Sequence, residues 1–201
     1  MSMRKSERIL LHITNLTVVA FSAFAICFLA VYPVNSSFLP LTGMIGLVVG
    51  CIVWRIYCDR LLHLLLNHTG FQLAVHVILM IGLFGFFMGV PIFNILPGIL
   101  MAYVCGLNSR LNQVSTAQFH HKLKIVQWSN LMILLLFLAL SAVIALRDPY
   151  TGANLKGMLG LSHEVSRGNI YWLIFLGGAG LMGLEWLFES KISRWVYRRH
   201  L

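Results

Sequence analysis

The chain has 201 residues, of which 59% are hydrophobic and only 10% charged. A soluble domain carries about 25% charged residues, so this composition excludes an ordinary soluble fold and indicates a lipid bilayer as the surrounding solvent. The net charge of +9 is concentrated in a few short segments, which we interpret as membrane topology, and we expect no nucleic-acid binding.

Six apolar segments predict an all-α fold, a polytopic integral membrane bundle of six transmembrane helices. A helix needs about 20 residues to cross roughly 30 Å of hydrocarbon. The first segment follows a basic start but is longer than a signal-peptide core of about 7–15 residues, so we expect it to be retained. The chain is predicted to be a single transmembrane domain, 1–201, with spans at 9–32, 41–62, 71–89, 92–107, 123–146 and 169–188.

Basic residues alternate between the two ends of these spans. The termini and the even-numbered gaps hold 12 of the 15 Lys and Arg residues, and the odd-numbered gaps hold three. By the positive-inside rule both termini face the cytoplasm, N-in and C-in. We therefore predict a protein of the bacterial inner (plasma) membrane. Its basic cytoplasmic rim is expected to meet anionic lipid or a cytoplasmic partner.

The third and fourth spans are short, and two interpretations of them remain open. Gly89, Val90 and Pro91 predict a turn between two full crossings, but the same segment could form a re-entrant hairpin. The fourth span also contains Asn94, Pro97 and Gly98. Proline inside a helix removes a backbone hydrogen bond, so Asn94 and Pro97 mark a candidate broken helix beside a cavity. The alternative places both prolines in the first turn of the helix.

Polar residues within the spans form the candidate polar site. Arg55, Asp59 and His63 follow one another at four-residue intervals in the second span, so they share one helix face. Glu185 lies in the sixth span at a depth similar to that of Arg55, and we expect these two residues to form an ion pair. Ionisable residues in spans are costly and are candidates for function; the alternative is that Arg55 anchors the helix at the headgroups.

Three histidines are predicted to lie in the same cytoplasmic layer. His12 is near the start of the first span, His63 is at the end of the second, and His76 is in the third. Histidines on different spans at one depth could ligate a haem iron, so haem b is a possible cofactor with His12, His63 and His76 as its ligands. Histidines at the membrane interface without a ligand are the alternative.

Glycines are concentrated on the second, third and sixth spans, among them Gly46 and Gly50, and Gly177 to Gly183. Small residues at this spacing allow helices to approach closely, so we expect these spans to form the packed centre, within one chain or between copies in a homo-oligomer or with other membrane subunits.

Catalytic motifs are lacking. The chain has no P-loop, GxGxxG or HExxH motif and no serine nucleophile motif, so we expect no enzyme. The first functional hypothesis is an integral membrane subunit or scaffold of a multi-protein or homo-oligomeric assembly. A small transporter or channel with a polar site in the inner leaflet is the alternative, and a b-type haem electron-transfer subunit is the third.

Overall fold

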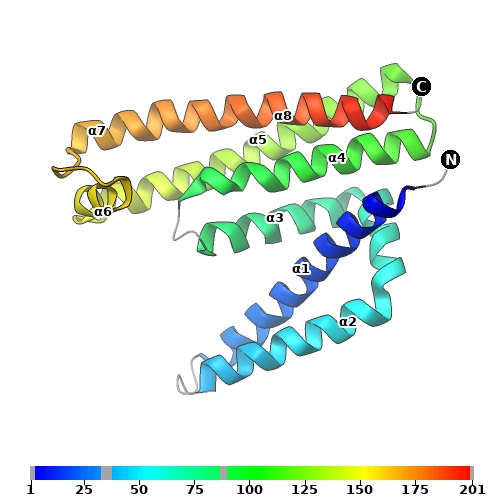
Figure 1. The fold of residues 1–201 in the computed structure, drawn as a ribbon, viewed down its shortest axis with the longest axis horizontal. Coiled ribbons are helices and arrows are strands. Elements are labelled where there is room, and N and C mark those ends of the chain that lie inside the picture. The colour runs from blue at the N-terminus through cyan, green and yellow to red at the C-terminus, as the bar shows by residue number, and fades with distance from the viewer. Residues whose placement is uncertain (1–2, 33–37, 87–89, 200–201) are drawn as a thin grey trace. The chain divides into compact units, whose positions relative to one another are not determined.

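The computed structural model describes residues 3–32, 38–86 and 90–199. Within these ranges it contains six helices that are long and apolar enough to cross a membrane, which confirms the predicted all-α bundle of an integral membrane protein (Figure 1). The chain divides into two compact units. Unit 1 comprises Met1–Gly82 and Leu107–Gln113, and unit 2 comprises Leu83–Gly106 and Val114–Leu201. The predicted single domain stays a prediction.

Unit 1 is built on a hairpin of α1 (Lys5–Val31) and α2 (Leu39–Asn67), followed by α3 (Thr69–Phe86), whose last residues belong to unit 2. Small residues permit the close approach of α1 and α2. A Cβ atom added to Gly46 would lie 2.6 Å from the Ala23 carbonyl oxygen, and one added to Gly50 would lie 2.6 Å from Ala20 Cα. The predicted role of these two glycines in helix packing is therefore confirmed, with α1 as their neighbour.

Unit 2 contains two long helices that run alongside each other, α5 (Thr116–Arg147) and α8 (Gly178–Arg198) (Figure 1). The helix that ends as α8 begins as α7 (Arg167–Trp172) and passes through one stretch of π-helix, η3 (Leu173–Gly177). A 3-10 turn, η2 (Pro91–Asn94), leads into α4 (Ile95–Leu111), whose last residues belong to unit 1. The short α6 (Thr151–Leu159) lies between α5 and α7 in the chain.

Several helices are longer than the predicted spans, because polar residues continue them beyond the apolar segments. The sixth span is predicted to end at 188, whereas α8 continues as a helix to Arg198. The span boundaries themselves stay predictions. The third and fourth spans form separate helices of 18 and 21 residues, at Thr69–Phe86 and Pro91–Leu111, each long enough to cross a membrane. The turn predicted around Gly89 lies outside the described residues.

The apolar helix with the largest buried fraction in the described ranges is the fourth, which is not one of the three glycine-rich spans. In the most apolar stretch of the fourth helix 56% of residues are buried, against 11% to 22% in the other five apolar helices of the described ranges. Glycines of the sixth span are less confined, because a Cβ atom added to Gly180 or Gly183 would have no neighbour within 4 Å in the described part of the chain. Their predicted packing between copies stays a prediction.

Candidate functional site

A buried polar stripe runs along α8. Glu185, Glu189, Ser193 and Tyr197 follow at four-residue intervals, so they lie on one helix face. All four are buried, and the exposed fraction of both glutamates is 0%. A helix that places two carboxyl groups one turn apart in its buried face needs polar or charged partners for them, because an unpaired buried charge is costly.

The helix α4 presents small residues to this stripe. Gly98, Ala102 and Gly106 are four apart, and Ala102 is fully buried. A Cβ atom on Gly98 would overlap Glu185 Oε1 and would lie 3.0 Å from Glu189 Oε1. A Cβ atom on Gly106 would lie 2.5 Å from the Ser193 carbonyl oxygen. Both carboxyl groups therefore reach the same point of α4, and only glycine leaves room for them there.

The neighbouring helix α5 contributes two amide side chains. Asn130 Nδ2 donates a hydrogen bond of 2.5 Å to Glu189 Oε1 and one of 3.1 Å to the carbonyl oxygen of Gly98. One turn earlier, Gln127 Nε2 donates to Ser190 Oγ at 2.8 Å and to the Trp186 carbonyl oxygen at 3.2 Å. These bonds connect α5 with α8 and with α4, and the bond from Asn130 fixes the position of the Glu189 carboxyl group.

The Glu185 carboxyl group lacks a comparable hydrogen-bond donor in the described residues. Within the described residues, neither oxygen of its carboxyl group has a hydrogen-bond partner, and Glu189 Oε2 has none either. The groups of unit 2 that border the pair in the contacts above are the neutral Asn130 and Gly98. Two neighbouring carboxylates in a buried site are costly to keep charged without a cation. We call Glu185, Glu189, Asn130 and Gly98 the carboxyl site.

The ligand set of the carboxyl site is small. The described part of the chain contains no group of three or more His, Cys, Asp and Glu side chains that could hold a metal ion. Mg²⁺ and Ca²⁺ take about six to eight oxygen ligands, and carboxylates usually supply several of them. Two carboxyl groups could instead share one proton, which needs no further ligand.

The predicted site on α2 is an exposed face. Arg55, Asp59 and His63 are all exposed on this helix, as their four-residue spacing required, and Cys51 continues the row. Arg55 also lines a shallow hollow with apolar neighbours such as Val48 and Ile52. An ion pair between Arg55 and Glu185 would join residues of different units, and it stays a prediction.

The three predicted haem ligands all belong to unit 1. The His12 ring packs edge-on against Trp54, with ring centroids 6.1 Å apart. His63 is exposed and its ring centroid lies 6.3 Å from that of His68, whereas His76 is buried in α3. The binding of haem stays a prediction, and an absorption spectrum of the purified protein would test it.

The two prolines of the candidate broken helix lie at or before the start of α4. Pro91 opens η2 and Pro97 lies in the first turn of α4, where the missing N–H has no intrahelical partner to lose. Asn94 ends η2 and is fully buried, one turn before Gly98. The two residues thus lie at the start of the helix that carries the small-residue face of the carboxyl site.

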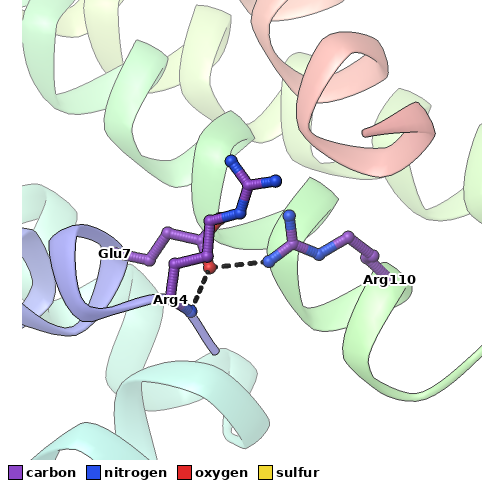
Figure 2. A network of polar contacts seen from close by, with 3 residues as sticks. All are labelled: Arg4, Glu7 and Arg110. Carbon is purple, nitrogen blue, oxygen red and sulfur yellow. Dashed lines mark hydrogen bonds and ion pairs between the residues drawn. The ribbon is translucent and has the colours of Figure 1, made fainter. Parts of the chain in front are cut away.

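A second buried charged group joins α1 to the end of α4 within unit 1. Arg110 Nη2 lies 2.7 Å from Glu7 Oε2, and the same oxygen accepts a 2.9 Å hydrogen bond from the Arg4 backbone N–H (Figure 2). Both side chains of this ion pair are almost completely buried. Arg110 lies in the last turn of α4, which holds its side chain beside Glu7.

The sequence contained a signal for Glu189 that the predicted span boundary concealed. Glu189 lies four residues after Glu185, on the same helix face, but one residue beyond the predicted end of the sixth span at 188. Asn130 and Gly98 are not adjacent to either glutamate in the sequence, and no local pattern identifies them as neighbours.

No protein-family model, curated protein or solved structure matches this chain.

Proposed function

We propose that the protein is a small membrane transporter or channel that carries protons, with Glu185 and Glu189 as the groups that bind them. The observation that carries the proposal is the burial of two carboxyl groups against Gly98, one of them without a hydrogen-bond partner in the described residues. Ionisable side chains at membrane depth are costly, and they recur in the proton relays of pumps and transporters.

A proton fits this site better than a metal ion for two reasons. Asn130 already directs an N–H group at Glu189 Oε1, and an N–H donor repels a cation bound to that oxygen. The close contact of the carboxyl groups with Gly98 also leaves little space for a metal ion with several ligands. A proton shared by the two carboxyl groups neutralises one charge without requiring space.

The rest of the buried polar stripe on α8 indicates a path by which protons reach the carboxyl site. Ser193 and Tyr197 continue the buried polar face from the carboxyl site towards Arg198 at the helix end. The uneven distribution of Lys and Arg supports cytoplasmic termini in a bacterial inner membrane. In that orientation the stripe runs towards the cytoplasm, and we propose that protons exchange with the carboxyl site along it.

Proton flux into proteoliposomes tests the proposal. The vesicles enclose a pH-sensitive dye, and a potassium diffusion potential supplies the driving force. We expect Glu185→Gln and Glu189→Gln each to lower protein-dependent flux at least tenfold, because an amide cannot release a proton. Glu164→Gln, which changes an exposed carboxyl group of the same unit, is the matched control. Parental flux in both site variants would refute the proposal.

A membrane subunit or scaffold is the second candidate, favoured by the exposed row on α2. Arg55 and Asp59 are exposed on a helix whose surrounding residues are apolar, including Ile52 and Ile56. Charged groups in such a face are stabilised by headgroups or by another protein chain. Mass measurement by light scattering in mild detergent would distinguish these cases. A stable oligomer that Arg55→Leu and Asp59→Leu dissociate would support the scaffold, whereas a parental monomer would count against it.

A further inference from the structure

We propose that the exposed face of the last turns of α8 binds the phosphate group of an anionic lipid. This face, which we call the cationic face, consists of Lys191, Arg194, Trp195, Arg198 and Arg199. Its residues line a surface hollow, and they recur three or four positions apart on one side of the helix. The proposal is independent of the proton site.

Buried contacts on the opposite side of α8 fix the rotation of the helix, so that the cationic face points outward. Val196 and Tyr197 are buried. The Tyr197 ring stacks on Phe119 with centroids 4.1 Å apart, and its hydroxyl group donates a 2.7 Å hydrogen bond to the Val114 carbonyl oxygen. Rotating α8 about its axis would break these contacts, so the cations stay on the exposed side.

The positive charge of this face is not balanced locally. The ion pair recorded in the described ranges joins Glu7 to Arg110 in unit 1, so the four cations of the face have no carboxylate within salt-bridge distance in those ranges. Within unit 2, Asp148 and Glu164 lie in the segments around α6, before α7 begins, and the two other acidic residues belong to the buried carboxyl site. An anion approaching the hollow therefore meets uncompensated positive charge.

The contact between Arg199 and Trp195 orients the Arg199 guanidinium group, whose N–H groups can donate hydrogen bonds to the oxygens of a ligand. The guanidinium carbon of Arg199 lies 3.8 Å from the centroid of the Trp195 ring. This cation–π contact occupies one side of the guanidinium group, and its other N–H groups remain able to donate hydrogen bonds. Arginine edges match the geometry of phosphate oxygens, and tryptophan is enriched where membranes meet water.

The residues before the cationic face favour a lipid over a soluble phosphate compound. Leu184, Leu187 and Phe188 are exposed on the same side of α8, one to two turns before Lys191. The exposed surface thus changes from apolar to cationic along the helix. A lipid has the same order, with an apolar acyl chain followed by a charged phosphate group. A free phosphate or a nucleic acid would gain nothing from the apolar part, whereas a lipid would contact both.

Lipid titration of the full-length protein in a neutral detergent tests the inference. The probes are dioleoyl phosphatidylglycerol, dioleoyl phosphatidylcholine and inorganic phosphate, with bound lipid measured by native mass spectrometry. We expect tighter binding of phosphatidylglycerol than of phosphatidylcholine. The double variant Arg194→Gln/Arg198→Gln should weaken phosphatidylglycerol binding about 30-fold, because each basic residue near a membrane surface contributes about fivefold.

Two further variants make the result specific. Arg147→Gln/Arg167→Gln removes the same charge from exposed positions of the same unit and should leave binding unchanged. Arg194→Lys/Arg198→Lys keeps the charge and should retain most of the binding. Equal affinity for the two lipids would overturn the inference, as would equal losses in the two glutamine double variants. Displacement of the lipid by millimolar inorganic phosphate would assign the face to free phosphate instead.

Discussion

Asn130 and Glu189 form the hydrogen bond that joins α5 to α8 in the interior of unit 2, with 2.5 Å between Asn130 Nδ2 and Glu189 Oε1. Asn130→Leu would leave the Glu189 oxygen buried without its donor, and we expect it to lower the free energy of unfolding by about 1–3 kcal/mol. Replacing both partners by apolar groups removes the unmet hydrogen bond. The double variant Asn130→Leu/Glu189→Leu should therefore lose less stability than the sum of the two single changes.

Unfolding in detergent, followed by circular dichroism, measures this double-mutant cycle. Additive effects of the two substitutions would show that the hydrogen bond contributes no coupling between α5 and α8.

Gly98 allows the Glu185 carboxyl group to reach α4, and this close approach leads to a prediction about activity. Gly98→Ala would place a methyl group where Glu185 Oε1 lies, so the carboxyl group must move. We expect proton flux in proteoliposomes to fall at least tenfold. Gly180→Ala is the matched control, because a Cβ atom there meets nothing within 4 Å in the described residues. Equal flux in the two variants would argue against the carboxyl site.

Gly106 lies against backbone atoms of α8, so its substitution should affect stability. A Cβ atom on Gly106 would approach the Ser193 carbonyl oxygen to 2.5 Å, and a backbone cannot turn aside as a side chain can. We expect Gly106→Ala to lower the free energy of unfolding by about 1–3 kcal/mol, the usual cost of overpacking. A Cβ atom on Gly183 would meet none of the described residues within 4 Å, so Gly183→Ala should be neutral or stabilising, by about 0.4–1 kcal/mol. Thermal unfolding in detergent compares the two.

The buried ion pair of Glu7 and Arg110 predicts a strong effect of breaking it from one side (Figure 2). Glu7→Gln would leave the Arg110 guanidinium group buried without its counter-charge, and we expect a loss of about 3–5 kcal/mol. The exposed Glu164→Gln should change stability by less than about 0.5 kcal/mol. Chemical unfolding in mixed micelles measures both variants, and an equally small effect of Glu7→Gln would show that the pair is dispensable.

Local composition was sufficient for much of the fold. Apolar segments of about 20 residues predict membrane helices because lipid cannot hydrogen-bond to the backbone, so each segment satisfies its own polar groups. The α2 row of Arg55, Asp59 and His63 was also predictable as one helix face, because it depends only on helical spacing. Helix ends were less predictable, because polar residues extend α8 past the last apolar residue to Arg198.

The sequence by itself determined the class of protein, the number of apolar helices and the uneven distribution of charge, because these depend on neighbours along the chain. Only the tertiary structure decided that Glu189 faces Gly98 and Asn130, and that Glu7 faces Arg110. The partners of Glu189 are 91 and 59 residues away and those of Glu7 are 103 residues away, counted along the sequence. Contacts across such separations arise from the packing of helix faces, and a buried charge is stabilised by whichever group that packing brings to it.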